Sequence, residues 1–337
     1  MMLSMVNFLK WTLRLKLLAY CCFVEAANLQ NFSQKCMGTE FKILIDHDDP
    51  KISYSAARSA FNECERLNLI FSDYLVDSEI SRLSESSYSN ISQRLSNELF
   101  HVLFFGNNLS LKTNGAFDPT IGHLSRLWRV SRFRQALPLK KDIVLAKSLS
   151  GFTFLEFFED RQEVKINKPG LILDLGGIAK GFTADMMLKK LKSVGMHRSL
   201  IDAGGDITLG EPPRGQKGWN IEIGGRKHPD LPELELSNCS IATSGDIEQF
   251  VKIGKTQYSH ILNPKTGFGI ENISQVTMIA KDGITADSYA TAASVLGPEK
   301  TSDLLIRNTH HKAFFLCKEL SGVELLVLQD QEFNLEK

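Results

Sequence analysis

Residues 174–181 read Asp-Leu-Gly-Gly-Ile-Ala-Lys-Gly, and this stretch decides how the fold and the function of the chain are interpreted. It follows the apolar run Leu171–Leu173, and a helical pattern continues over residues 178–194, so we expect a strand-to-helix junction here. Paired glycines let a ligand approach the backbone, and the first turn of a helix offers unpaired N–H groups to an anion. A turn that needs glycine only for packing is the alternative. The flanking Asp174 and Lys180 favour a ligand site with a mobile positive charge.

The composition predicts an ordinary globular protein with a full core, since 43% of the 337 residues are apolar and 23% are charged. The 39 basic residues balance 39 acidic ones, and no run of Lys or Arg stands out. Such a chain has no net field that attracts the phosphate backbone of a nucleic acid, so we expect no nucleic-acid partner.

The first 27 residues differ from the rest and are typical of an export signal. Lys10, Arg14 and Lys16 precede a short apolar stretch at residues 17–24, and small residues follow it. This stretch is far shorter than the roughly 20 residues that a spanning helix needs. We therefore predict a cleavable signal peptide over residues 1–27, with an amphipathic helix as the alternative because the basic region is long.

A lipoprotein signal is a further interpretation of the same segment. Cys21 and Cys22 follow an apolar run, as at a bacterial cleavage site where the new N-terminal cysteine is acylated, but Tyr20 is bulkier than the usual small residue there. Lipid anchoring to a membrane therefore stays open.

The four cysteines that remain after the signal show no CxxC or Cys/His spacing, so they predict neither a zinc site nor a disulfide framework. We expect them to be small buried hydrophobic residues. They are Cys36, Cys64, Cys239 and Cys317.

Helical and strand patterns are mixed along the chain without strict alternation, which favours an α+β fold with a largely antiparallel sheet and flanking helices. We expect helices from about Ser53 and around Leu95–Leu103, a polar loop with at most one helical turn over residues 71–85, and a helix over residues 287–296. A GxGxxG dinucleotide fingerprint is absent, which argues against a Rossmann site.

The stretch Ala286–Thr291 lies at the start of that last expected helix. Asp287 and Thr291 are four residues apart, so their oxygen atoms share one helix face, and such donors suit a hard cation such as Mg²⁺. Asp287 as a plain helix cap is the alternative.

His260 precedes a turn that Asn263, Pro264 and Gly267 build. This turn fixes the imidazole, which is the natural proton acceptor near neutral pH. A structural histidine is the alternative.

A second turn, Thr113–Thr120, contains Phe117 and Asp118, which suit walling a ring system and accepting hydrogen bonds from a base or ribose. Turn chemistry alone also explains these residues. Tyr74 in the serine-rich loop is a further exposed aromatic with the same two interpretations.

Taken in order, these segments resemble the ApbE family of FAD:protein FMN transferases. The resemblance covers the chain from Met37 to about Gly297, and we assign the flavin transferase domain to residues 36–330. The segments that carry it are Met37–Thr39, Phe71–Tyr74, Asp77–Ser81, Gly115–Thr120, Asp174–Gly181, Ala203–Asp206, Ala242–Gly245, Ser259–His260 with Pro264, Thr266 and Gly267, and Ala286–Asp287 with Ala290 and Thr291. Ser84 departs from the pattern, since the family often has Asn there.

The resemblance implies two related subdomains that enclose FAD, with Mg²⁺ at its diphosphate. By residue match, the FAD site is lined by Met37, Tyr74, Ala116, Phe117, Asp118, Asp174, Lys180, His260 and Ile261. The metal ligands are Gly177 through its carbonyl, Asp287 and Thr291. Lys180 and His260 are in addition the expected catalytic residues.

The resemblance also implies the reaction, in which the FMN half of FAD is joined to a Ser or Thr hydroxyl of an acceptor protein and AMP is released. The acceptors of the family are typically flavin-carrying subunits of membrane redox complexes, so we expect the periplasmic side of the inner membrane. A Mg²⁺-dependent FAD diphosphatase and a non-catalytic flavin carrier are the alternatives. Tyr74 argues against hydrolysis, because an aromatic residue here accompanies transferase-type sites in the family.

Overall fold

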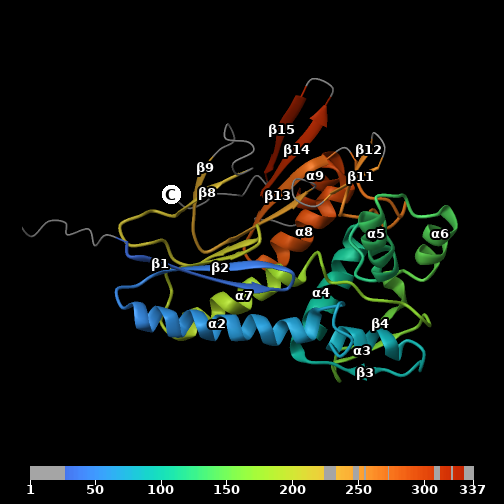
Figure 1. The fold of residues 1–337 in the computed structure, drawn as a ribbon, viewed down its shortest axis with the longest axis horizontal. Helices are drawn as coiled ribbons and strands as arrows, with labels where there is room; N and C mark the ends of the chain where they lie inside the picture. The colour runs from blue at the N-terminus through green and yellow to red at the C-terminus, as the bar shows by residue number, and fades with distance from the viewer. Residues whose placement is uncertain are drawn as a thin grey trace, which may run out of the picture.

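The computed structural model describes residues 27–223, 233–245, 250–253, 256–271, 273–306, 312–319 and 322–329 (Figure 1). Residues 1–26 of the predicted signal lie outside these ranges, and with them the expected cleavage or lipidation. Within the described ranges, no helix is both long enough and apolar enough to cross a membrane.

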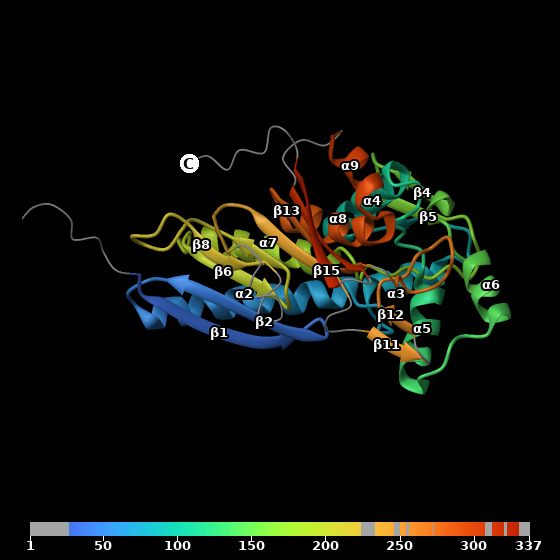
Figure 2. The ribbon, with the colours of Figure 1, turned by 90° about the horizontal axis from the view of Figure 1, so that it is seen from above.

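An eight-stranded sheet forms the centre of the molecule (Figures 1 and 2), and the ladders described for it are antiparallel. The expected α+β class with a mainly antiparallel sheet is confirmed, whereas the division into two related subdomains stays a prediction. In spatial order the strands are β1 (Leu29–Cys36), β2 (Thr39–Asp46), β6 (Ser199–Ala203), β7 (Ile207–Leu209), β10 (Ser240–Gly245), β13 (Ile273–Ala280), β14 (Lys312–Glu319) and β15 (Gly322–Gln329).

The two faces of this sheet contact different elements, because successive side chains of a strand point to opposite faces. In β13, Met278 and Ala280 belong to the core under the helices, whereas Ile279 between them belongs to the core on the other face. The helices on the first face are α2 (Pro50–Phe71), α7 (Ala179–Ser193) and α8 (Gly283–Leu296). The second face packs against the hairpin of β8 (Trp219–Glu222) and β9 (Glu233–Leu236).

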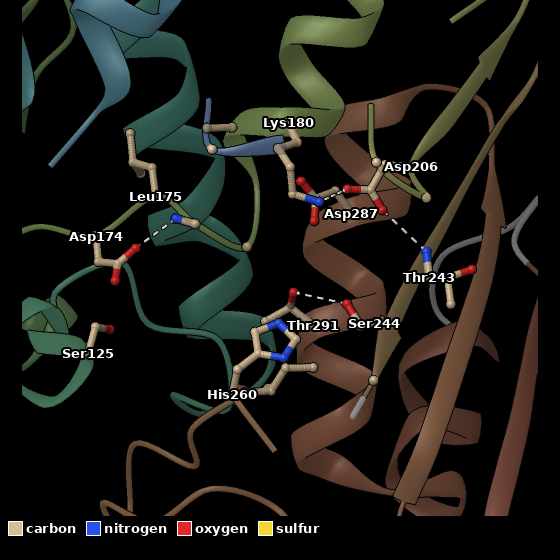
Figure 3. Close-up of a pocket in the computed structure, with 18 of the residues that line it drawn as sticks. Ser125, Asp174, Leu175, Lys180, Asp206, Thr243, Ser244, His260, Asp287 and Thr291 are labelled. Atoms are coloured by element: carbon tan, nitrogen blue, oxygen red, sulfur yellow. Dashed lines mark hydrogen bonds and ion pairs between the residues drawn. The ribbon is translucent and has the colours of Figure 1, made fainter. Parts of the chain in front are cut away.

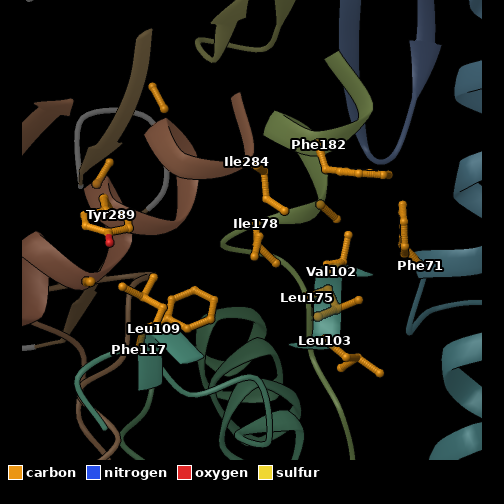
Figure 4. Packing of buried hydrophobic residues seen from close by; sticks show 14 of the residues in the cluster. Phe71, Val102, Leu103, Leu109, Phe117, Leu175, Ile178, Phe182, Ile284 and Tyr289 are labelled. Atoms are coloured by element: carbon orange, nitrogen blue, oxygen red, sulfur yellow. The ribbon is translucent and has the colours of Figure 1, made fainter. Parts of the chain in front are cut away.

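Short elements fill the chain between α2 and α7 and lie beside this sheet (Figure 1). Val102, Leu103 and Leu109 of α4 belong to the same core cluster as Ile178 at the start of α7 and Ile284 of α8 (Figure 4). The elements are α3 (Glu79–Ser86), β3 (Gln93–Arg94), α4 (Asn97–Lys112), α5 (Gly122–Arg134), α6 (Lys140–Ser148), a 3₁₀ turn (Phe152–Phe154), β4 (Leu155–Phe158) and β5 (Glu163–Ile166). The remaining elements are the hairpin β11 (Phe250–Ile253) and β12 (Thr256–Ser259), and α9 (Pro298–Ile306).

The serine-rich segment is more ordered than expected. Helix α2 continues to Phe71, and α3 begins at Glu79, so only residues 72–78 form a loop. The Ser78 hydroxyl accepts a hydrogen bond from the backbone N–H of Ser81 at 3.2 Å. Serine therefore acts here as a helix N-cap and not as a loop former.

Residues 171–173 form no strand, contrary to expectation. Their backbone partners are scattered: the Ile172 carbonyl accepts from Gly122 N at 3.1 Å, and Leu173 N donates to the Ser84 hydroxyl at 3.1 Å. The apolar run is buried by packing and by these single bonds. Ser84, where the family pattern has Asn, thus supports the backbone that leads to Asp174.

The start of α8 was also wrongly placed. The helix begins at Gly283, and Asp282 is its N-cap, with the carboxylate accepting from Thr285 N at 3.1 Å. Asp287 lies inside the helix, so the interpretation of Asp287 as the cap is wrong and its carboxylate needs another role.

The cysteines agree in part with the expectation. Cys36 and Cys64 are buried and free, whereas free Cys239 is only partly buried. The side chain of Cys317 lies outside the described part of the structure.

Candidate active site

One cavity of about 960 Å³ brings together segments that are far apart in the sequence. All twelve residues expected at the flavin and metal sites line it. They are Met37, Tyr74, Ala116, Phe117, Asp118, Asp174, Gly177, Lys180, His260, Ile261, Asp287 and Thr291.

The Gly-Gly turn forms one wall of this cavity. The Asp174 carboxylate accepts a hydrogen bond from Gly176 N at 2.7 Å, which closes a tight turn of its own, and α7 starts at Ala179. The N-cap position of α7 is Ile178, which makes no side-chain cap bond. The turn therefore presents the positive end of a helix to the cavity, as expected for a phosphate site.

Close packing brings this turn against α8. A Cβ atom on Gly177 would lie 2.8 Å from the Thr291 hydroxyl oxygen, so only glycine allows this approach. The Asp287 carboxylate accepts a hydrogen bond from Gly181 N at 3.0 Å. The Gly-Gly turn and α8 therefore touch. The turn contributes the Gly177 carbonyl, and α8 contributes the Asp287 carboxylate and the Thr291 hydroxyl.

This oxygen-rich donor set fits Mg²⁺ bound together with a ligand phosphate. In the described residues, no group of three or more His, Cys, Asp or Glu is arranged to hold a metal, so a closed protein cage is not built. Mg²⁺ typically uses one or two carboxylates and completes its shell with water and substrate phosphates. Gly177, Asp287 and Thr291 would supply that kind of partial shell.

Charge in the site is concentrated on Lys180, Asp206 and Asp287, which lie together in Figure 3. Lys180 forms an ion pair with Asp206. Burial alone would lower the pKa of the Lys180 ammonium, but the carboxylates of Asp206 and Asp287 outweigh burial and raise it. Burial and the repulsion from Asp206 raise the pKa of Asp287 to about 7. Two buried carboxylates facing one ammonium favour a further cation at this point.

Asp206 was quoted in a sequence motif but was not expected as a site residue. It is 4% exposed, and its second oxygen accepts a hydrogen bond from Thr243 N at 3.3 Å. Two residues before Asp206, Gly204 has φ of +72°, and a Cβ there would lie 2.4 Å from the Thr39 hydroxyl oxygen. The glycine turn therefore brings Asp206 toward Lys180.

The comparisons with known proteins identify the family of the chain. Residues 37–315 match the model of the ApbE family. The chain belongs to the ApbE family. Among its relatives, an FAD:protein FMN transferase of Treponema pallidum is 30% identical over 294 residues, which cover 80% of this chain and 79% of the relative. One from Escherichia coli K12 is 27% identical over 299 residues, covering 85% and 83%.

A solved structure gives the same result. A mutant of the flavin transferase ApbE from Vibrio cholerae superimposes with a TM-score of 0.81 at 28% identity, covering 91% of this chain and 99% of that one. The fold described above is therefore that of an ApbE flavin transferase.

In this ApbE family member, Arg129 of α5 is a pocket residue that sequence analysis missed. Its guanidinium donates to the Asp73 carboxylate at 2.6 and 3.2 Å and to Asp174 at 3.4 Å. It also lies 4.0 Å from the ring centroid of Tyr74. Burial alone would lower the pKa of the Arg129 guanidinium, but the carboxylates of Asp73 and Asp174 outweigh burial and raise it. Arg129 thus joins the loop after α2 to the Gly-Gly turn.

Tyr74 is 72% exposed, as expected, and lies at the rim of the pocket. Phe117 differs, since it is 4% exposed and belongs to the main core. Its ring packs against Gly106, where a Cβ atom would lie 3.2 Å from a ring carbon, so glycine leaves room for the ring at the pocket wall.

Asp118 is held by its own turn. Its carboxylate accepts from the Thr120 backbone N–H at 2.8 Å and from the Thr120 hydroxyl at 2.6 Å. Burial raises the pKa of Asp118 above its ordinary value. A ligand donor that reaches this carboxylate would therefore meet an oriented acceptor.

His260 is exposed and lies directly after β12. The expected turn is confirmed: Gly267 N donates to the Asn263 carbonyl at 2.7 Å, and the Asn263 side chain accepts from Lys265 N at 2.9 Å. A satellite core supports it, since the Trp128 indole donates to the Gly267 carbonyl at 2.8 Å. The exposed imidazole is therefore carried by a fixed turn, and Figure 3 draws it among the residues that line the pocket.

Proposed function

We propose that this chain transfers the FMN half of FAD, with the help of Mg²⁺, to a Ser or Thr hydroxyl of an acceptor protein. The observation that carries the proposal is the meeting of Gly177, Lys180, Asp287 and Thr291 at one wall of the cavity, beneath a helix N-terminus. A volume of about 960 Å³ is near the upper end of ligand pockets, which suits a dinucleotide. The names of the relatives support the same activity.

The reaction that fits these residues is a displacement at the FMN phosphorus. The acceptor oxygen forms a bond to this phosphorus, the bond to the bridging oxygen breaks, and AMP leaves with that oxygen. Bound Mg²⁺ supplies charge neutralisation at the diphosphate. Lys180 is placed to neutralise charge on the phosphoryl oxygens, and the α7 N-terminus orients them.

His260 is the residue that we assign to proton removal from the acceptor hydroxyl. Because it is exposed on a fixed turn at the rim, an acceptor segment can reach it from solvent. The proton passes from the hydroxyl to an imidazole nitrogen as the new phosphoester bond forms. Tyr74 and Phe117 are the residues that we assign to contact with the isoalloxazine ring of FAD.

Hydrolysis is the second candidate, in which water takes the place of the acceptor hydroxyl. The Tyr74 ring lies against the Arg129 guanidinium at the rim of the pocket. This arrangement favours binding of a flavin ring there and limits access of water to the phosphate. A flavin carrier without turnover would need no exposed proton acceptor.

The test combines the purified chain, FAD, MgCl₂ and a candidate acceptor, and mass spectrometry reads the acceptor. We expect an added FMN on the acceptor and an equal amount of AMP. Free FMN with AMP means a diphosphatase, and bound flavin without products means a carrier. Asp287→Asn should lose nearly all turnover and its Mg²⁺ dependence, whereas Asp303→Asn on the exposed side of α9 should match the wild type.

For the location, we propose export to the periplasmic side of the inner membrane. The basic and apolar N-terminal segment supports export, and acceptors in membrane redox complexes fit that side. Separate mass measurement of the chain recovered from cells distinguishes a cleaved signal, a lipidated cysteine and an intact N-terminus.

A further inference from the structure

The hairpin of α5 and α6, residues 122–148, carries a surface that the proposed reaction does not use. The whole chain has equal numbers of acidic and basic residues, but this segment has a single acidic residue, Asp142. Its seven basic residues are Arg126, Arg129, Arg132, Arg134, Lys140, Lys141 and Lys147. The hairpin is therefore strongly positive within a neutral protein.

Helix α5 divides its residues between two faces, as the helical period requires. Ser125, Trp128, Arg129 and Arg132 line the flavin pocket on one face. Arg126, Val130 and Phe133 are exposed on the other. The outward face is thus not part of the flavin site.

Six large apolar side chains of the hairpin are exposed to solvent. The exposed fractions are 46% for Val130, 90% for Phe133, 43% for Leu137, 60% for Leu139, 67% for Val144 and 60% for Leu145. Every residue from 122 to 148 is described, and the exposed charged residues among them are all basic: Arg126, Arg134, Lys140 and Lys141. These ten residues are called the hairpin surface below.

The hairpin surface lies on helices that are well packed on their buried side, so its exposed apolar side chains do not result from a poorly packed core. Leu124, Trp128, Ile143 and Ala146 pack against Tyr258 and Leu262 on the opposite side of the hairpin. Figure 2 places α5 and α6 at the outer edge of the molecule, and in Figure 1 α6 is the outermost helix. The exposed apolar side chains are therefore available to a flat partner.

We propose that the hairpin surface docks onto the headgroup region of an anionic lipid bilayer. Apolar side chains bordered by Lys and Arg enter the boundary between headgroups and acyl chains, while the cations contact lipid phosphates. A protein partner fits less well, because Lys is depleted at protein interfaces. The proposal does not rest on FMN transfer, since it concerns residues outside the pocket. Docking would bring the pocket, on the other face of α5, close to the membrane.

Hydrogen–deuterium exchange of the full chain with lipid vesicles locates the contact. With vesicles of phosphatidylcholine and phosphatidylglycerol, we expect slower exchange in peptides from residues 122–148, and with pure phosphatidylcholine no change. High salt should reverse the protection, because it screens exposed charges. Protection that is absent from the hairpin, or that an acceptor protein induces and vesicles do not, would overturn the proposal.

Variants with matched controls separate the two contributions. Phe133→Ser with Leu139→Ser, and Arg134→Glu with Lys140→Glu, should each weaken binding to the anionic vesicles at least about tenfold. The apolar control is Leu69→Ser with Leu111→Ser, and the charge control is Lys189→Glu with Lys190→Glu, all at exposed positions on other helices. All four proteins share the same N-terminus, so its contribution cancels. Hairpin variants that bind as tightly as their controls would contradict the proposal, and unchanged flavin binding shows that each variant is folded.

Discussion

Asp206 holds the Lys180 ammonium against the pocket wall and is itself fixed by Thr243 N at 3.3 Å. It also faces Asp287, whose pKa it helps to raise. Among single residues we therefore expect Asp206 to position both charges of the proposed phosphate site, Lys180 and Asp287.

Asp206→Asn should lower kcat roughly 10- to 100-fold, because a misplaced Lys180 no longer lies against the reacting phosphate. The KM for FAD should change only a few-fold, since the rest of the pocket is intact. Steady-state kinetics of FMN transfer give both constants. A normal kcat in this variant would show that Lys180 keeps its place without the ion pair.

His260→Ala should bind FAD as the wild type does but transfer FMN about 10²- to 10⁴-fold more slowly, as expected for loss of a general base. Flavin fluorescence titration measures the affinity, and acceptor labelling measures the rate. A large loss of affinity with the same loss of rate would instead make His260 a ligand contact.

The candidate site residues that belong to a local sequence motif could be predicted from the sequence, whereas Arg129 could not. Arg129 and Asp73 are 56 residues apart, and no local spacing links them. Asp206 lay within a quoted motif, but its role follows only from the ion pair with Lys180.

Between elements, the crossing of α7 and α8 determines the site. A Cβ on Gly181 would lie 2.0 Å from the Gly283 carbonyl oxygen, so the two helices touch through backbone. Asp185 of α7 accepts hydrogen bonds from Gly283 N at 2.7 Å and Ile284 N at 2.9 Å. One helix therefore caps the other, which keeps Asp287 aligned with the Gly-Gly turn.

This cap makes stability depend on pH. Burial raises the pKa of Asp185 from 3.8 to about 7, so the folded chain binds more protons than the unfolded chain between these values. The contribution to stability is complete below the unfolded pKa and is lost as pH rises through about 7. Urea unfolding at several pH values should show that the free energy of unfolding, relative to Asp185→Asn, falls by on the order of 4 kcal/mol over this window. Parallel pH profiles for the two proteins would exclude a raised pKa at Asp185.

The misplaced elements share a cause. The periodicity of α8 did not reveal its first turn, because Gly283 and the cap Asp282 precede the expected start. Leu171–Leu173 was apolar enough for a strand, yet its backbone bonds go to Ser84 and α5. Tertiary contacts, which single-sequence patterns do not contain, decided both cases.

Over the whole molecule, the pocket joins the β1–β2 turn, the loop after α2, α5, the start of α7, the turn after β12, and α8. A ligand that binds here contacts residues that only the folded chain brings together. The class of fold was predictable, because mixed helical and strand patterns without alternation indicate α+β. The order of strands was not, since β2 pairs with β6 across most of the helical residues.

FAD with Mg²⁺ should therefore stabilise the protein as a whole. At a ligand concentration of about 100 times Kd, we expect Tm to rise by roughly 5 °C or more. Differential scanning calorimetry checks this with FAD, with Mg²⁺ and with both. In Asp287→Asn, Mg²⁺ should add nothing to the shift with FAD; an undiminished addition would place the metal elsewhere.

One wall of the pocket, the proposed phosphate site, pairs Gly177 with Thr291, so this wall is incomplete until the chain has been made past α8. A ribosome-bound chain that stops short of this helix lacks Asp287 and Thr291, and with them part of the proposed flavin site, however complete its earlier strands are. If the proposed function holds, binding of the dinucleotide would follow synthesis, and prematurely terminated products would leave the cellular flavin supply untouched.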